Sequence, residues 1–179
     1  MCVFDPVAGG EALLVIDVQA STLEVFTDPA TGAPRLACGT GNHDNGDVRV
    51  FDPVAGGEAL LVIDVGSQVN VLEFFADPAT GELRLACGCE DWKVRIYDPV
   101  SGGETLVVLE GHMDRVRALT VFTDRATGAL RLACSSRDSV QVWDLTAGGV
   151  ALFVLEEHTD RVYALTAFAF YWSGARTWR

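Results

Sequence analysis

Long apolar runs are missing from this 179-residue sequence. None approaches the roughly 18 consecutive apolar residues that a membrane-spanning helix needs, so no membrane partner is expected. The first ten residues, MCVFDPVAGG, also lack the basic start and the apolar stretch of a secretory signal. We therefore expect a protein that neither crosses a membrane nor enters the secretory route.

Basic residues are scarce as well. The chain has 13 Lys and Arg residues against 25 Asp and Glu residues, which gives a formal charge of −12 at pH 7. Because an acidic surface repels phosphate backbones, this balance disfavours nucleic acid as a partner. Neither a Ser-His-Asp spacing nor a phosphate-binding loop is found in the sequence, so we expect no enzyme activity and no cofactor.

The sequence does contain one segment that recurs along the chain. FDPVAGGEALLVIDV stands at residues 4–18 and again, unchanged, at residues 51–65. Looser copies begin at Tyr97 and Trp143. The first aromatic residues of the four copies are 47, 46 and 46 residues apart. A fixed period of about 20–50 residues indicates a repeat architecture.

Each repeat divides into four short apolar runs separated by turn residues. In the third repeat the runs are VRIY, TLVVLE, VRALTVF and LRLAC, and the turns between them are DPVSGG, GHMD and DRATGA. Such runs favour strands, since none reaches helical length before Gly or Pro interrupts it. We predict an all-β fold with strands near residues 48–51, 59–64, 69–75, 83–87, 94–97, 105–109, 116–122, 130–134, 140–143, 151–155 and 162–168.

One hairpin of the repeat keeps a constant length. Nine residues separate the last Phe of the third apolar run from the Arg of RLAC in every copy. The pairs are Phe26 and Arg35, Phe75 and Arg84, and Phe122 and Arg131. The connections on either side vary in length. Variable loops between fixed strands are typical of a scaffold with a working surface.

Cysteines follow the repeat too. Cys38, Cys87 and Cys134 occupy one repeat position, which predicts small buried residues rather than disulfide partners. The odd total of five fits a reducing compartment, so we expect an intracellular, cytoplasmic protein. The two thiols of CGCED (residues 87–91) and His43 are candidate metal ligands. A metal site needs three or four converging ligands, and none is expected here.

Four strands every 46 residues predict one β-propeller blade per repeat. ACGCEDWKVRIYD at residues 86–98 resembles, position for position, the ASGSDDGTVRLWD phrase of the WD40-repeat family. ACSSRDSVQVWD at residues 133–144 is similar with one residue fewer. GHMDRV at 111–116 resembles the Gly-His turn of that family, and EHTDRV at 157–162 is a degenerate copy. The resemblance covers the chain to about Phe168.

The resemblance implies a structural tetrad in each complete blade, in which His, Ser or Thr, Asp and Trp form a buried polar network. Only the third full blade supplies the set, as His112, Ser135 or Ser136, Asp138 and Trp143. Tyr97 replaces the Trp in the second blade and Phe51 in the first. We expect those two blades to be held mainly by packing.

The resemblance also implies a partner-binding rim where the innermost strands begin. The rim positions are Gln19 and Ser21, Gln68 and Asn70, Arg115 and Arg117, and Arg161 and Tyr163. Because Arg and Tyr often anchor interfaces, we expect the last three pairs to bind other proteins or peptides. The planar guanidinium groups match the geometry of carboxylate and phosphoryl groups, so we expect an acidic or phosphorylated segment as the partner. The alternative is that these long side chains only cover the rim in water.

The repeat count predicts an incomplete ring. We expect a single repeat domain over residues 1–179, with a partial blade at 1–18, full blades at 19–65, 66–110 and 111–156, and a partial blade with a divergent tail at 157–179. Since the chain starts and stops inside a blade, an open arc is favoured over a closed four-bladed ring. Open sheet edges invite self-association.

The predicted function is a non-enzymatic protein-interaction scaffold. Two alternatives remain open. One is a ligand-binding or metal-binding propeller or a propeller enzyme, and the other is a fragment of a larger WD40 protein without independent activity.

Overall fold

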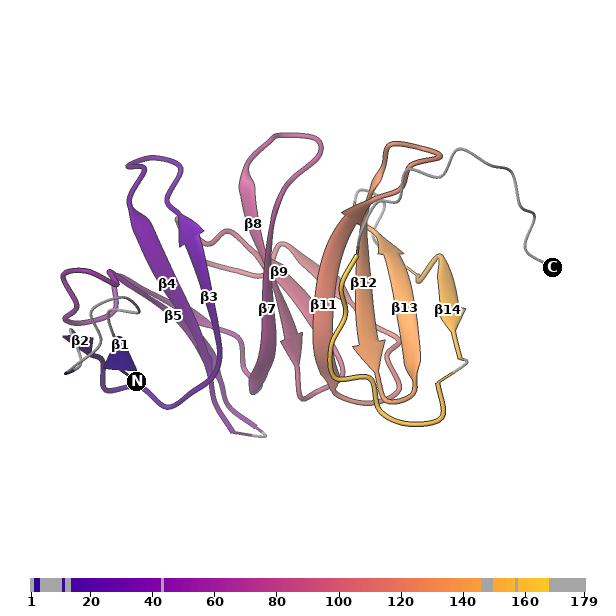
Figure 1. Cartoon of the computed structure of the whole chain (residues 1–179), viewed down its shortest axis with the longest axis horizontal. Helices are drawn as coiled ribbons and strands as arrows, with labels where there is room; N and C mark the ends of the chain where they lie inside the picture. The colour runs from indigo at the N-terminus through magenta and orange to yellow at the C-terminus, as the bar shows by residue number, and fades with distance from the viewer. Residues whose placement is uncertain are drawn as a thin grey trace.

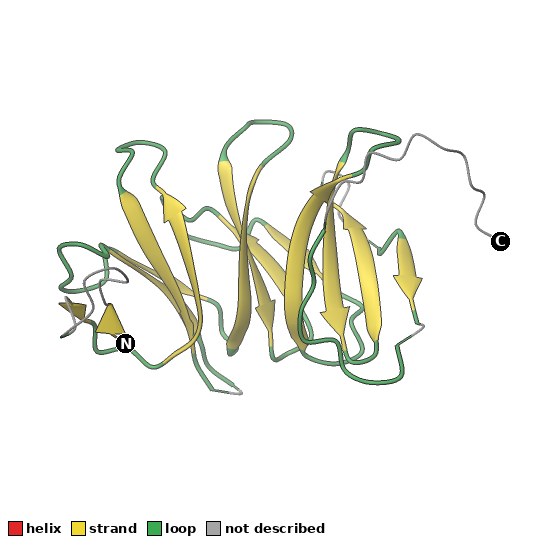
Figure 2. Cartoon of the chain, in the orientation of Figure 1, coloured by secondary structure: helices red, strands yellow, loops and turns green. Residues whose placement is uncertain are grey.

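The computed structural model describes residues 2–3, 11, 14–42, 44–145, 150–156 and 158–167. Over these residues the chain is all β, with strands joined by loops and no helix (Figure 2). A helix long and apolar enough to cross a membrane is accordingly not found in this part of the chain. The strands are β1 (Cys2–Val3), β2 (Leu14–Val15), β3 (Ala20–Thr27), β4 (Pro34–Thr40), β5 (Asp47–Phe51), β6 (Leu61–Asp64), β7 (Val69–Ala76), β8 (Leu83–Cys89), β9 (Val94–Tyr97), β10 (Val107–Leu109), β11 (Val116–Thr123), β12 (Leu130–Ser136), β13 (Ser139–Asp144) and β14 (Phe153–Leu155).

Three four-stranded antiparallel sheets of the same design make up most of the structure. Each uses consecutive strands, in the orders β3-β4-β5-β6, β7-β8-β9-β10 and β11-β12-β13-β14. The first strands contact one another, β3 against β7 and β7 against β11. The sheets therefore stand as successive blades of an open arc, with the β1-β2 pair at one end and β14 at the other (Figure 1). The predicted all-β class and open arc are confirmed.

The hairpin of constant length is the pairing of the first two strands in each sheet. Phe26 lies opposite Arg35 in the β3-β4 ladder. In the turn between them, the Asp28 carbonyl accepts the Gly32 N–H at 2.8 Å, and the Asp28 carboxylate accepts the Ala30 N–H at 2.9 Å. The other sheets repeat this register with Phe75 opposite Arg84 and Phe122 opposite Arg131. The nine-residue spacing therefore encodes strand register.

The apolar core lies between neighbouring sheets. Val48 of the first sheet and Leu85 of the second belong to one buried cluster, and Leu109 of the second and Trp143 of the third belong to another. A single sheet cannot bury both of its faces, whereas adjacent sheets cover one another. Cys87 and Cys134 lie in these two clusters, and Cys38 lies in a third cluster with Ile16. All three are fully buried free thiols, so their predicted burial is confirmed.

The predicted strand at 162–168 is wrong over residues 162–167, which form no strand. Residue 168 lies outside the described part of the chain. The Val162 N–H does donate to the Arg137 carbonyl at 2.9 Å, and Val162 and Leu165 pack on the third sheet. The segment lacks strand geometry because, among the described residues, no following strand pairs with it. The fourth strands at 61, 107 and 153 also begin two residues later than predicted.

Candidate functional site

A chain of polar side chains joins the second and third sheets at the rim. Gln68 Nε2 donates to Asn70 Oδ1 at 3.1 Å, and Asn70 Nδ2 donates to Glu90 Oε2 at 3.1 Å. Glu90 Oε1 lies 2.6 Å from Arg115 Nη1. Gln68 and Asn70 lie at the start of β7, Glu90 follows β8, and Arg115 precedes β11. The structure thus brings three predicted rim residues together around Glu90, which the sequence prediction missed.

The charge of Arg115 is already neutralised within this group. Its side chain is 40% exposed, whereas the Glu90 side chain is only 9% exposed. Arg115 Nε also lies 3.6 Å from Asp114 Oδ1. A buried carboxylate left without its cation is costly, so an incoming anion would have to displace Glu90. Arg115 is therefore better placed to join two sheets than to bind a ligand.

The rim beyond the third sheet has a different electrostatic character. The guanidinium carbon of Arg117 lies 5.2 Å from the centre of the Tyr163 ring, a cation–π contact. Tyr163 is 62% exposed, and Arg161 is exposed beside it in sequence. Within the described ranges, neither arginine side chain forms an ion pair with a carboxylate. These two guanidinium groups remain open to an external anion.

A single change of sequence between repeats explains this difference. Glu90 stands three residues after Cys87, and Arg137 stands three residues after Cys134. Because the Val162 N–H donates to the Arg137 carbonyl at 2.9 Å, Arg137 is held beside the segment that carries Arg161. This junction therefore has a second arginine where the preceding junction has a carboxylate. Comparison of the two repeats could have identified both residues.

The first predicted rim pair does not form a comparable site. Gln19 is exposed at the rim of the first sheet. Ser21 Oγ lies within hydrogen-bond distance of two carbonyl oxygens, 3.0 Å from that of Gly39 and 2.5 Å from that of Val69. Since Val69 belongs to the second sheet, Ser21 joins two neighbouring blades.

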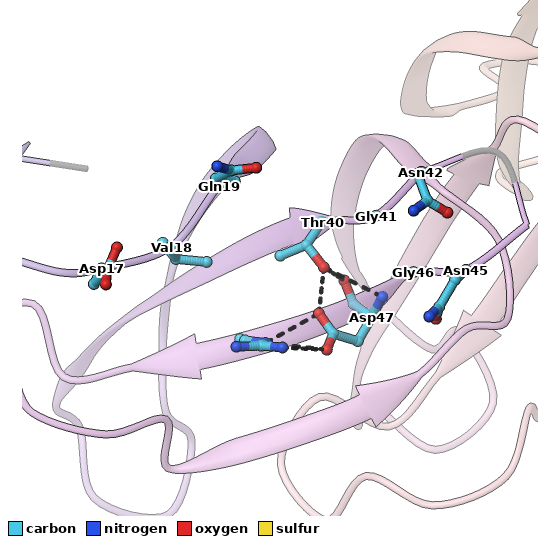
Figure 3. A pocket seen from close by; sticks show the side chains of 10 residues that line it. Asp17, Val18, Gln19, Thr40, Gly41, Asn42, Asn45, Gly46 and Asp47 are labelled. Atoms are coloured by element: carbon cyan, nitrogen blue, oxygen red, sulfur yellow. Dashed lines mark hydrogen bonds and ion pairs between the residues drawn. The ribbon is translucent and has the colours of Figure 1, made fainter.

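A polar hollow of about 430 Å³ lies at the rim of the first sheet (Figure 3). Gln19, Thr40, Asp47 and Arg49 are among the residues that line it. Arg49 Nε and Nη2 lie 3.0 and 2.9 Å from Asp47 Oδ2, and Thr40 Oγ1 donates to Asp47 Oδ1. Because the carboxylate and the guanidinium satisfy each other, the hollow presents no unpaired charge from this pair to a ligand.

The expected tetrad is reduced to a pair of rings. His112 and Trp143 are buried with ring centres 5.4 Å apart. No partner among the described residues hydrogen-bonds to either nitrogen of His112 or to Trp143 Nε1. Ser135 Oγ instead accepts the Ala118 N–H at 2.9 Å. Asp138 is exposed in the turn between β12 and β13, so it does not converge with His112 as predicted.

The reason lies in the short β12-β13 turn. This segment has one residue fewer than its counterpart at 86–98, and Asp138 is one of the two residues that reverse the chain. Ser136 Oγ, the other candidate hydroxyl, donates to the Asp114 carbonyl at 2.9 Å. Burial lowers the pKa of His112 to about 4, so its ring is neutral at pH 7. His112 is therefore a packed neutral ring.

The paired cysteines of CGCED lie in the core. Cys89 Sγ donates to the Cys87 carbonyl at 3.4 Å. Burial raises the pKa of Cys89 to about 12 and that of Cys87 well above its ordinary value. Nucleophilic attack and metal binding both use the thiolate, which is disfavoured here. No group of three or more potential metal ligands occurs over the described residues, and His43 lies outside them.

No protein-family model matches the chain, and no curated protein matches it. Among solved structures, the chain is similar to the computationally designed protein Ika8, with a TM-score of 0.66 and 22% sequence identity over 94% of this chain and 46% of that one. It is also similar to a chain in the crystal structure of an active polycomb repressive complex 2 in the basal state, with a TM-score of 0.58 and 16% identity over 79% of this chain and 31% of that one. The likeness is one of fold, and this chain spans less than half the length of either neighbour.

Proposed function

We propose that the protein is a non-enzymatic protein-interaction scaffold of the WD40-repeat kind. We propose further that its partner is a protein segment carrying carboxylates or a phosphoryl group. The row of four-stranded blades supports the scaffold, and the Trp143-Asp144 pair and the GHMDRV turn at 111–116 support the repeat family. One protein of similar fold is a chain of a multiprotein complex, polycomb repressive complex 2.

The arginine-rich junction beyond the third sheet is the observation that supports an anionic partner segment. Arg117 lies over the exposed Tyr163 ring, and Arg161 is exposed two residues before that ring. Arg137 is also exposed, and its carbonyl accepts the Val162 N–H. A guanidinium presents a planar fork of donors that matches a carboxylate or a phosphoryl group. The Tyr163 ring adds a flat apolar surface for the backbone or a side chain of the same segment.

The charge of the whole chain limits how this site works. With a formal charge of −12, the protein repels an anionic segment at long range. Salt screens exposed charges beyond roughly 8–10 Å, so the arginines act mainly on a segment that is already close. Selectivity must then come from direct contacts in the complex, and association is slow without electrostatic steering.

The test uses fluorescently labelled peptides of one length in three forms, which contain phosphoserine, glutamate or only neutral residues. The complete chain is titrated against each peptide by fluorescence anisotropy. We expect the two anionic forms to bind and the neutral form to fail. Loss of a hydrogen bond to a charged group costs roughly 1.5–3 kcal/mol, so Arg161→Glu should weaken anionic-peptide binding by at least about tenfold.

Arg125→Glu is the matched control. Arg125 is exposed in the turn after β11, at the opposite end of that strand from the rim, and the substitution changes the net charge by the same amount. We expect its peptide binding to match that of the unmodified chain. Equal binding of neutral and anionic peptides, or no effect of Arg161→Glu in a folded protein, would contradict the proposed partner class.

A further inference from the structure

The β1-β2 pair repeats the outer half of a blade. Cys2 pairs with Val15 in that ladder. Addition of 47 to each number gives Arg49 and Val62, which pair in the β5-β6 ladder of the first sheet. The second pairing of β1 and β2 follows the same shift. The N-terminal end of the arc therefore carries the third and fourth strands of a blade, and no described residue supplies its first two strands.

The other end of the arc carries the beginning of a blade. Val162 and Leu165 pack against Val140 and Val142 of the third sheet. Val116, which stands 46 residues before Val162, is in the same way part of the buried cluster between the second and third sheets. Residues 162–167 therefore occupy the position of a first strand beyond the third sheet. No described residue supplies the outer strands there.

Exposure at equivalent positions shows that each end face is covered only in part. Ile16, which follows β2, packs on part of the first sheet, and residues 162–167 pack on part of the third. On the face that each sheet turns toward the next sheet in the chain, Ile63 and Leu109 are each 1% exposed, whereas Leu155 is 49% exposed. On the face turned toward the preceding sheet, Leu72 is 4% exposed, whereas Leu23 is 47% exposed. The interior positions are buried by a complete neighbouring sheet. Leu23 and Leu155 are exposed because the described residues at the two ends supply only part of such a sheet.

We propose that a second copy of this chain covers both faces, head to tail. The third sheet of one copy and the first sheet of the other then pack on opposite sides of one shared blade. The first sheet of the one copy and the third sheet of the other pack in the same way on a second shared blade, so two copies close a ring. At each junction, residues 162–167 of one copy and β1-β2 of the other contribute to one shared blade. This proposal does not rest on the proposed peptide-binding function.

Repetition within the chain is the reason for choosing a second copy. The junctions between the first and second sheets and between the second and third are two examples of the same contact. The exposed positions on the two end faces are those that a neighbouring blade buries at these junctions, and a copy of this chain supplies parts of that blade at both ends. A heterologous contact of this kind closes into a ring or continues as a filament. This chain matches 46% of the length of the designed neighbour, so that protein is about as long as two such arcs.

The test begins with the mass of the complete chain by light scattering after size-exclusion chromatography. We expect twice the 19.2 kDa of one chain, unchanged over a wide range of protein concentration. A mass of one chain would overturn the proposal, and a mass that grows steadily with concentration would overturn the closed pair. Leu23→Asp and Leu155→Asp each place a charge on one free face and should each give single chains.

Val108→Asp is the matched control, because Val108 is 40% exposed on the outer strand of the middle sheet, away from both end faces. It should remain paired. A mixture of Leu23→Asp and Leu155→Asp chains then tests the head-to-tail geometry. One junction in the mixed pair contains no substitution, so pairs should reappear. If the mixture remains single chains while each variant is folded by circular dichroism, the head-to-tail contact is refuted.

Discussion

Arg115 Nη1 lies 2.6 Å from Glu90 Oε1, across the junction between the second and third sheets. The two partners differ in burial, because the Glu90 side chain is 9% exposed and the Arg115 side chain is 40% exposed. Asn70 donates to the other oxygen of Glu90 at 3.1 Å. The carboxylate therefore depends on groups from both sheets, and the pair couples the two blades.

Removal of either partner should reveal this coupling. We expect Arg115→Gln to lower the free energy of unfolding by about 1–2 kcal/mol, because it leaves a nearly buried carboxylate without its cation. With allowance for the partial exposure of Arg115, a double-mutant cycle with Glu90→Gln should give a coupling energy of about 1 kcal/mol, measured by urea unfolding.

The Lys93–Glu110 pair is the control for that cycle. Its atoms are also 2.6 Å apart, but its side chains are 39% and 64% exposed. Exposed pairs contribute little, so its coupling energy should lie at about 0–0.5 kcal/mol. Equal coupling energies in the two cycles would show that the Arg115–Glu90 pair does not join the blades.

His112 should make the fold sensitive to mild acid. Burial lowers the pKa of His112 in the folded chain from 6.5 to about 4. The unfolded chain therefore binds a proton at a higher pH than the folded chain, and stability falls as the pH drops from about 6.5 to about 4. The loss relative to a variant without this imidazole should reach roughly 3 kcal/mol at pH 4.

His112→Phe isolates the effect, since it keeps a ring against Trp143 and has no titrating group. Urea unfolding of both proteins at pH 7, 5.5 and 4 gives the comparison. The difference in stability should grow as the pH falls. Parallel pH profiles would mean that His112 titrates alike in the folded and unfolded chains.

Gly88 should tolerate no larger residue. A Cβ atom there would lie 2.6 Å from Val71 Cγ1 and 2.8 Å from Val116 Cγ1, which belong to β7 and to the neighbouring β11. We expect Gly88→Ala to lower the free energy of unfolding by about 1–3 kcal/mol through overpacking. In a Val116→Ala background the same substitution should cost less, because one clashing group is removed. An equal cost in both backgrounds would exclude this clash as the cause.

Trp92 should be strained by its backbone conformation. It has a φ of 69°, in the left-handed region that favours glycine, and its side chain is 52% exposed. Trp92→Ala and Trp92→Gly both remove the indole, but only the glycine also removes Cβ. We expect the Gly variant to be about 1 kcal/mol more stable than the Ala variant in thermal unfolding. A more stable Ala variant would show that this turn adopts another conformation in solution.

Strand content and hairpin register could be predicted because they depend on neighbours in sequence. The spacing of Phe122 and Arg131 is set by a six-residue turn whose Asp124 carbonyl accepts the Gly128 N–H at 2.7 Å. A short turn of defined geometry leaves one register for the two strands that it joins. The strand prediction at 162–167 was wrong because a strand there depends on a distant partner rather than on neighbours in sequence. The described residues do not supply that partner strand.

The candidate site was predicted only in part. The repeat alignment located Arg115, Arg117, Arg161 and Tyr163 on the rim, but it treated the arginines as equivalent. Arg115 pairs with Glu90, whereas the residue after Arg161, Val162, donates its N–H to the Arg137 carbonyl. The tetrad prediction failed at Asp138 because a shorter turn moved that side chain to the surface. Glu90, Arg137 and Asp138 all lie within the segments that were aligned, at 86–98 and 133–144, but their contacts and exposure depend on the folded chain.

The sequence by itself determined the period of the blades, the hairpin register and the burial of the RLAC cysteines, because each is a local property that recurs every 46 or 47 residues. Only the tertiary structure decided which equivalent positions are buried and which charges are paired. Leu23 and Leu72 hold the same place in the repeat, yet they are 47% and 4% exposed. Their exposure depends on the presence of a neighbouring sheet, and sheet-to-sheet contact is a property of the assembled arc rather than of any one repeat.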